Sequence, residues 1–415
     1  MPKLLSLFRH SGIFRALRHP KFATYIAAHA GSVVGLWIQR IAIQWLVWTL
    51  TGSYAWLGAI ALAEALCATV FSLVGGPLAD RIDRAFLASL TQSLLMVIAG
   101  CLAAVTFLGW INIPVLMVFV MMTGAVEGVW TPVRLSIMPN MVPREDMAAA
   151  VALTALIFNL AIFIGPAIGA IIITVFSVEG AFVANAISYL GLVVVFLRLK
   201  LPSQALPRAS NSSYKGDLFA GLRYVLNSVS LRTIVSFGFV FSLFMRPYRE
   251  LFAGIADEVL HLGAEGLGAL ASAAGFGAMI GALFIAGYGR TQALVNVLIA
   301  VAFCAVVFLL LFAFADTLWF AMATAAGLSL CVTVFGTSAQ MMVQMSVADH
   351  MRGRVMSLWQ AQFRGVPTIA AWAIGLLEPW LGLRGIFVAA SILFAVFLLM
   401  SLRHKQHLMV FEDDR

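Results

Sequence analysis

The chain has few charged residues. Of its 415 residues only 11% are Asp, Glu, Lys or Arg, whereas 62% are hydrophobic. Soluble domains contain on average about a quarter charged residues and about half apolar ones. A chain so poor in charge cannot cover a surface that faces water. The composition therefore excludes both a soluble globular protein and a disordered one, and it predicts a protein embedded in lipid.

Cysteine pairs and the motifs of soluble enzymes are also missing. The four cysteines lie singly in apolar runs, which favours small apolar side chains in a membrane over a disulfide framework or a zinc site. The chain has no GxxxxGK[ST], HExxH or GxSxG motif, and the GFGAMIG segment at 275–281 lacks the spacing of a dinucleotide-binding loop. We therefore expect no enzyme, no ATP-driven pump, no cofactor and no metal.

Apolar runs of membrane-spanning length fill most of the chain. A helix needs about 20 apolar residues to cross the hydrocarbon of a bilayer. By this measure the sequence predicts an all-α integral membrane protein with twelve transmembrane helices in two six-helix bundles. The spans are expected at 22–50, 55–79, 85–109, 113–136, 147–173, 178–198, 232–257, 266–289, 292–315, 317–344, 354–378 and 384–402.

A polar break separates the two sets of six spans. It contains SQALPRASNSSYKGD, a run rich in Ser, Pro, Asn and charge, and predicts a cytoplasmic linker with an amphipathic helix near Asp217–Asn227. The expected domains are an N-terminal six-helix bundle with a basic arm, the linker, a C-terminal six-helix bundle and a cytoplasmic tail. Their ranges are 1–198, 199–231, 232–402 and 403–415.

The basic residues predict the orientation in the membrane. With an even number of spans both termini lie on one side, and the arm, the linker, the tail and the loops of that side carry nearly all the loop Lys and Arg. The opposite loops carry only Arg384. The positive-inside rule therefore places both termini in the cytoplasm of a multi-pass inner-membrane protein. Topology and anionic lipid account for the net charge of +8, so no nucleic-acid partner is expected.

A small set of charged residues lies inside the predicted spans. Each costs a few kcal/mol at the bilayer centre and should face a partner or a water-filled cavity. Arg40 and Glu64 lie at equal depth, about 15 Å below the outer surface at 1.5 Å per residue, so we expect them to face each other. They would form either a static salt bridge or a titratable pair that lines a pathway. The other members are Glu127, Arg246, Arg249, Glu250 and Arg364.

The run Arg246-Pro247-Tyr248-Arg249-Glu250 predicts a broken helix in the seventh span, because proline removes a backbone hydrogen bond. Broken helices are tolerated where they line a cavity, and a buried structural network is the alternative. In the fourth span, Glu127 and Arg134 are two turns apart and share a face. Four GxxxG pairs are expected to bring helices close together. They are Gly31/Gly35, Gly124/Gly128, Gly165/Gly169 and Gly277/Gly281.

The turn GGPLADRIDR at 75–84 resembles the signature loop of the major facilitator superfamily. The stretches at 35–53, 131–170 and 351–365 are similar to its enterobactin-exporter and macrolide-efflux branch. The resemblance implies two six-helix bundles that rock about a central site. It implies a cytoplasmic gate motif of Gly76, Asp80, Arg81 and Arg84, with Arg134 as the partner that we expect for Asp80. It also implies an antiport-like packing motif of Gly165, Pro166 and Gly169.

These features together predict a monomeric secondary transporter that exports a small amphipathic or anionic molecule in exchange for protons, with membrane lipid around it. Glu64, Glu127 and Glu250 are the candidates for carrying the proton. The candidates for a central substrate cavity are Arg40, Arg246, Tyr248, Arg249 and Arg364. Two alternatives stay open: an importer or lipid flippase on the same fold, and a sensor or assembly factor that does not transport.

Overall fold

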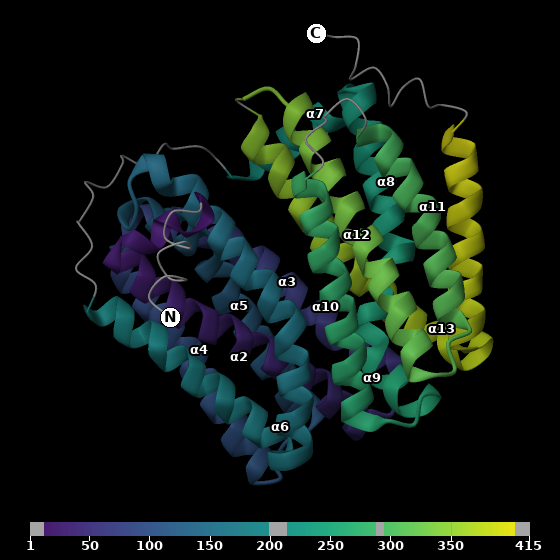
Figure 1. Cartoon of the computed structure of the whole chain (residues 1–415), viewed down its shortest axis with the longest axis horizontal. Helices are drawn as coiled ribbons and strands as arrows, with labels where there is room; N and C mark the ends of the chain where they lie inside the picture. The colour runs from purple at the N-terminus through teal and green to yellow at the C-terminus, as the bar shows by residue number, and fades with distance from the viewer. Residues whose placement is uncertain (1–11, 199–213, 288–293, 350, 403–415) are drawn as a thin grey trace. The chain divides into compact units, whose positions relative to one another are not determined.

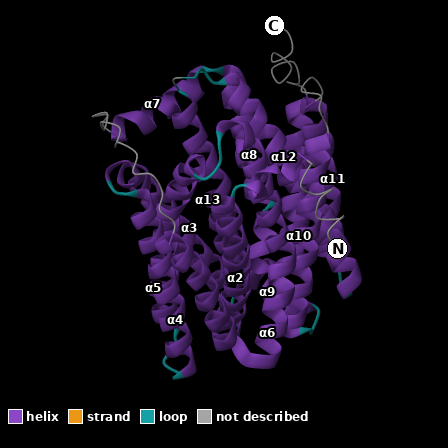
Figure 2. Ribbon diagram, turned by 60° about the vertical axis from the view of Figure 1, so that its left-hand side comes forward, coloured by secondary structure: helices purple, strands orange, loops and turns teal. Residues whose placement is uncertain are grey.

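The computed structural model describes residues 12–198, 214–287, 294–349 and 351–402. Within these ranges every regular element is a helix and no strand occurs (Figure 2). The predicted all-α fold is therefore confirmed.

The helices begin and end close to the predicted spans (Figure 1). The earlier ones are η1 (Gly12–Arg18), α2 (Pro20–Thr51), α3 (Tyr54–Arg81), α4 (Arg84–Phe107), α5 (Ile113–Ile137), η2 (Met138–Asn140), η3 (Arg144–Asp146) and α6 (Met147–Arg198). The later ones are α7 (Tyr214–Asn227), α8 (Val229–Met245), η4 (Pro247–Leu251), α9 (Phe252–Gly254), η5 (Ile255–Val259), α10 (Gly263–Gly287), α11 (Leu294–Ala313), α12 (Leu318–Ser346) and α13 (Arg352–Leu402). The short helix α7 confirms the amphipathic helix expected in the linker.

The number of spans is not confirmed as twelve, since ten helical stretches of the described residues are long and apolar enough to cross a membrane. Two of them hold α6 and α13, of 52 and 51 residues. A helix of that length measures roughly 75 Å, more than twice the hydrocarbon thickness. Each contains one non-helical residue, Ser177 in α6 and Gly382 in α13, both with a positive φ. These breaks fall in the predicted gaps between spans, so twelve crossings remain our prediction.

Local signals explain the turn between α4 and α5. Gly109 has a φ of 71°, and α4 ends just before it at Phe107. Asn112 then caps α5 by accepting a hydrogen bond from the Val115 N–H at 3.0 Å. A capping Asn satisfies one of the free N–H groups in the first turn of a helix. The predicted separation of these two spans is confirmed.

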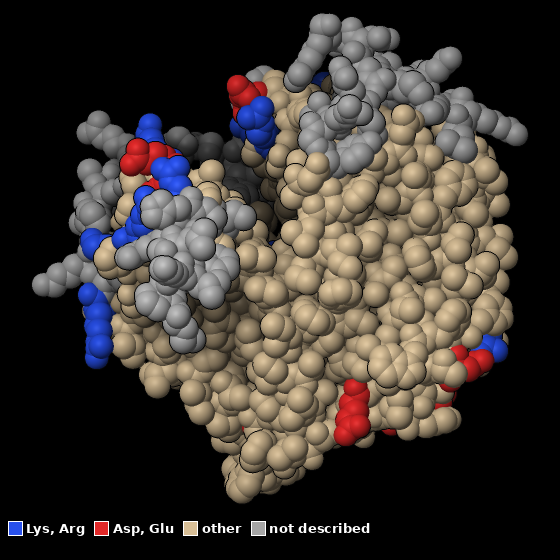
Figure 3. All heavy atoms as spheres, in the orientation of Figure 1, with Lys and Arg blue, Asp and Glu red and all other residues tan. Residues whose placement is uncertain are grey.

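The described chain falls into two compact units, and α3 is divided between them. Of the described residues, the first unit comprises 12–50 and 63–198, and the second comprises 51–62, 214–287, 294–349 and 351–402. In the first unit α4 packs along α6 and α5, and η1 lies on α6. In the second unit α10 and α11 pack on α12, and α8 and α11 pack on α13. The flank of the second unit seen in Figure 3 is free of charged side chains between its ends, as expected for a surface that faces lipid.

Glycines allow several of these helices to touch. A Cβ added at Gly124 of α5 would lie 2.6 Å from the Glu64 carbonyl oxygen of α3, and one at Gly281 of α10 would lie 2.8 Å from the Leu330 carbonyl oxygen of α12. Only glycine permits backbones to approach so closely. At the first GxxxG pair the expectation is wrong for one member. Gly35 meets Asn185 of α6, but nothing lies within 4 Å of a Cβ at Gly31.

Candidate functional site

Arg40 of α2 and Glu64 of α3 form an ion pair inside the first unit. The Arg40 Nη2 donates to the Glu64 Oε1 at 2.8 Å. The Arg40 guanidinium also lies 5.2 Å from the ring centroid of Trp37, one turn earlier on α2. The side chains are 43% and 23% exposed. The pairing expected from equal depth is confirmed, and its role in transport stays a prediction.

Neutral polar side chains continue this cluster along α2 and α6. The Asn185 Nδ2 donates to the Gln39 Oε1 at 2.6 Å, and both residues are buried. The buried Tyr189 lies one turn further along α6, where the charges of Arg40, Glu64 and Glu127 act on its hydroxyl. Four helices therefore bring polar groups together in an apolar interior. Our sequence analysis missed Gln39, Asn185 and Tyr189, because it searched the spans for charge alone.

Glu127 and Arg134 of α5 carry charge close to α2 and α6 of the first unit. Glu127 acts electrostatically on Tyr189, and Arg134 acts on Tyr25 and His29 of α2. The common face of Glu127 and Arg134 stays a prediction. His29, which the sequence analysis did not select, is 2% exposed and stacks on Tyr25 with a centroid distance of 5.3 Å.

The gate motif is only partly within the described structure. The side chains of Asp80 and Arg81, and the surroundings of Gly76, lie outside the described residues, and with them the expected contact between Asp80 and Arg134. The Arg84 Nη1 donates to the Ser136 carbonyl oxygen at 3.1 Å and so joins the start of α4 to the end of α5. The gate role of these residues remains a prediction.

The residues of the antiport-like motif make a close helix contact. A Cβ at Gly165 would lie 2.6 Å from the Trp37 Cβ, and one at Gly169 would lie 3.2 Å from the Ile38 Cα. The helix α6 continues through Pro166, because its only non-helical residue is Ser177. These glycines place α6 against the turn of α2 that precedes Arg40. The packing is shown, and a part in antiport stays a prediction.

In the second unit the helix breaks at the predicted proline. The α8 helix ends at Met245, and the chain continues from Pro247 as the 3₁₀ helix η4. At the break, the Arg246 Nη1 donates to the Phe363 carbonyl oxygen of α13. The Arg246 guanidinium also lies 3.6 Å from the centroid of the Phe363 ring. A backbone carbonyl and an aromatic face thus hold this cation.

The other candidates of this unit lie in different surroundings. Tyr248 is 1% exposed, with its ring centroid 5.4 Å from Phe252 and 5.9 Å from Phe312. Arg249 and Glu250 are half-buried on η4, and Arg364 is exposed on α13. Tyr248 is therefore packed into an aromatic core of its own unit. Within the described ranges, no group of His, Cys, Asp and Glu could hold a metal ion.

Long apolar helices with charged and polar groups in their interior define a multi-pass membrane protein, and solved structures share its fold. The fold is similar to that of a POT family transporter in complex with a thioalcohol-conjugated peptide, at a TM-score of 0.73 and 14% identity over 93% of this chain and 96% of that one. It is also similar to an inward-facing bacterial homologue of the human lysosomal transporter Spinster, at a TM-score of 0.70 and 14% identity over 92% and 97% of the two chains.

Sequence comparison gives the family. The model of the major facilitator family described as transmembrane secretion effector matches residues 11–414, and the chain belongs to this family of transporters, which are not enzymes. The chain is 23% identical to the staphyloferrin A transporter of Staphylococcus aureus over 78% of its length and 81% of the relative. It is 27% identical to the enterobactin exporter EntS of Shigella boydii over 64% of its length and 63% of the relative.

Proposed function

We propose that the protein exports a small anionic or amphipathic molecule, of the siderophore class, in exchange for protons. The names of its relatives support this substrate class, since one is a staphyloferrin A transporter and another an enterobactin exporter. The family description of a secretion effector supports the direction. The basic loops support an orientation with both termini in the cytoplasm, in the inner membrane.

The observation that carries the proposal is the ion pair of Arg40 and Glu64. A carboxylate that accepts a charge-assisted hydrogen bond loses most of that interaction when it takes up a proton. While Glu64 is deprotonated, its carboxylate could accept a hydrogen bond from the bound substrate, and Arg40 could contact an anionic group of the same molecule. Protonation of Glu64 would remove that acceptor and release the substrate. Because proton and substrate would then occupy the site in turn, one proton would be exchanged for one substrate molecule.

The neighbouring groups fit this scheme. Glu127 and Tyr189 lie within electrostatic reach of the pair and could pass the proton on. In the second unit Arg246, Arg249 and Arg364 would supply further positive charge, and Glu250 is one of the acids of that unit's broken helix. Asp80, Arg81, Arg84 and Arg134 would close the cytoplasmic side.

A flux measurement in proteoliposomes tests the proposal. Purified protein is reconstituted with an acidic lumen, and labelled enterobactin or staphyloferrin A is added outside. We expect one of the two siderophores to accumulate in the lumen, and a protonophore should abolish this accumulation. In Glu64→Gln the flux should be slow and should not depend on the pH gradient. Glu265→Gln is the matched control, because Glu265 is exposed in the first turn of α10. Flux of the wild type that ignores the pH step would refute proton coupling.

The same assay separates the alternatives. An importer or flippase would move its substrate with the proton, or would move lipid, and accumulation in an acidic lumen would not occur. A sensor or assembly factor would bind a ligand without any flux. Either result would overturn export as the function, while membership of the transporter family would stand.

A further inference from the structure

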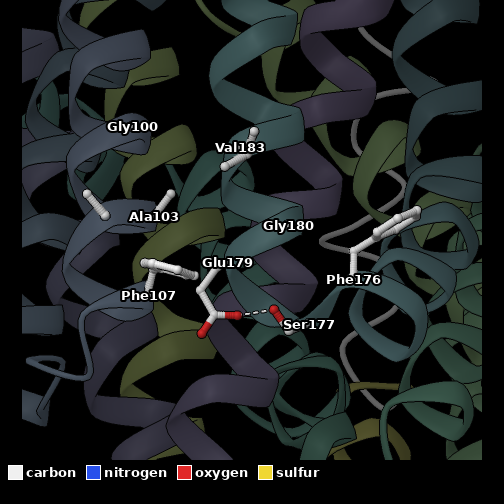
Figure 4. A pocket seen from close by; sticks show the side chains of 9 residues that line it. Gly100, Ala103, Phe107, Phe176, Ser177, Glu179, Gly180 and Val183 are labelled. Carbon is white, nitrogen blue, oxygen red and sulfur yellow. Dashed lines mark hydrogen bonds between the residues drawn. The ribbon is translucent and has the colours of Figure 1, made fainter.

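A groove lies on the flank of the first unit, where α4 ends and α6 is broken (Figure 4). It has a volume of about 470 Å³. Its lining is almost wholly apolar and contains one charged side chain. The residues that matter here are Gly100, Ala103, Phe107, Phe176, Glu179 and Gly180.

Backbone features keep the groove open. Ser177, with a φ of 69°, interrupts α6 and turns the chain there. Gly100 faces open space, because nothing lies within 4 Å of a Cβ built on it. At the rim the Ser177 hydroxyl donates to the Glu179 carboxylate, as the dashed line in Figure 4 shows. The groove is therefore a built feature of the α4 end and the α6 break.

Two apolar stripes lead away from the groove along neighbouring helices. On α4, the exposed Leu90, Leu94 and Val97 precede Gly100 at spacings of three and four residues, which is one face of a helix. On the second half of α6, the exposed Val183 and Ile187 follow Glu179 in the same way. Since α4 and α6 pack along each other, we take the two stripes as one continuous apolar surface, called the apolar track below, which begins at the groove. In a span-length helix such a face is covered by lipid.

The two ends of this track differ in chemistry. Phe107 is 80% exposed and Trp110, just beyond the end of α4, is 69% exposed, and aromatic side chains gather at the level of lipid headgroups. Beside them stands the Glu179 carboxylate. Among the residues that the structure describes, no Lys or Arg forms an ion pair with it. An aromatic rim, one carboxylate and an apolar track fit a molecule whose head carries an ammonium group and whose tail is long and apolar.

We propose that the groove binds a membrane phospholipid with a primary ammonium headgroup. The ammonium is held by Glu179, and one acyl chain lies over Gly100 and Ala103 and continues along the α4 and α6 stripes. A negatively charged lipid is rejected because its headgroup meets the carboxylate without a counter-charge. Ser177 keeps the carboxylate turned to the rim. This site is independent of the transported substrate and of proton coupling.

Native mass spectrometry of the full-length protein, purified with a defined mixture of phosphatidylethanolamine and phosphatidylglycerol, tests the proposal. We expect the protein to retain phosphatidylethanolamine over phosphatidylglycerol by about fivefold, which is the preference that one solvent-exposed ion pair would give. Glu179→Gln should abolish this preference, and the matched control Glu265→Gln should keep it. Gly100→Leu should reduce retention of both lipids, since a Cβ at this position meets no neighbour within 4 Å and the side chain grows from there into the groove.

Two results would overturn the proposal. The first is an unchanged preference in Glu179→Gln or unchanged retention in Gly100→Leu, which would show that lipid is held elsewhere. The second is a loss of siderophore flux in Gly100→Leu with lipid retention as in the wild type, which would make the groove a substrate site. Thermal unfolding of each variant confirms that it is folded before lipid is compared.

Discussion

The two units treat a cation inside the membrane in different ways. In the first unit Arg40 faces the carboxylate of Glu64 at 2.8 Å. In the second unit Arg246 donates to a backbone carbonyl and lies over the ring of Phe363. Both arrangements satisfy a guanidinium in apolar surroundings. They differ in that protonation of Glu64 can break the first contact, whereas neither the carbonyl oxygen nor the phenyl ring of the second takes up a proton.

That difference assigns the units different tasks in our proposal. A proton binding to Glu64 changes the charge around Arg40, whereas a carbonyl oxygen and a phenyl ring keep their properties at every physiological pH. The first unit would therefore sense the proton gradient, and the second would present a constant positive charge. Glu250, a carboxylate that can take up a proton, lies close to the break at Arg246. Experiments can therefore test whether the second unit is insensitive to protons.

Loss of the Glu64 charge should have the largest effect. Glu64→Gln leaves Arg40 without its anionic partner, and a hydrogen bond to a charged group contributes about 1.5–3 kcal/mol. We expect flux to fall by about tenfold or more and to lose its dependence on luminal pH, measured as initial rates over a pH series. Asp at this position should restore part of the coupling, because the carboxylate is kept.

A charge swap sharpens this prediction. The double variant Arg40→Glu/Glu64→Arg keeps an ion pair and should transport better than either single neutralisation. A swap that is as damaging as the single variants would contradict simple pairing. It would show that activity requires an arginine at position 40 itself, beside Trp37 and close to α6, and not only an ion pair between the two positions.

Arg246→Lys should have an intermediate effect. A lysine ammonium cannot lie flat on the Phe363 ring and donate sideways to its carbonyl as a planar guanidinium does. We expect a loss of stability of about 1 kcal/mol in thermal unfolding and a reduced flux. The pH profile of the remaining flux should equal that of the wild type. A shifted profile would contradict the division of tasks and would point to Glu250 as a proton carrier.

The sequence was sufficient for features that depend on depth and on backbone rules. Span length predicted the helices, Pro247 predicted the break after α8, and equal depth predicted the pair of Arg40 and Glu64. The depth of a residue follows from its position along the helix, because the rise per residue is constant. Depth can therefore be predicted without knowing how the helices pack.

Features that depend on helix rotation could not be predicted. Asn185 and Gln39 lie in spans 146 residues apart in sequence, and hydropathy does not tell which face of each helix meets the other. His29 gave no signal for the same reason. Gly31 had the spacing of a contact glycine, yet nothing lies within 4 Å of a Cβ built there, so its spacing alone did not show whether a second helix reaches that turn.

The smallest effect is expected at the neutral polar pair, which separates stability from transport in the first unit. Asn185→Ala leaves the Gln39 amide buried without its partner, at a cost of about 1 kcal/mol. The midpoint of thermal unfolding should fall slightly, with flux per folded protein unchanged. Asn159→Ala, on an exposed part of α6, is the control and should leave both the unfolding midpoint and the flux unchanged. Replacing both members by Leu should restore the midpoint, because no polar group is then left unpaired. If instead flux falls while the midpoint stays, the pair belongs to the proton pathway with Glu64 and Tyr189, and the titratable region is wider than one ion pair.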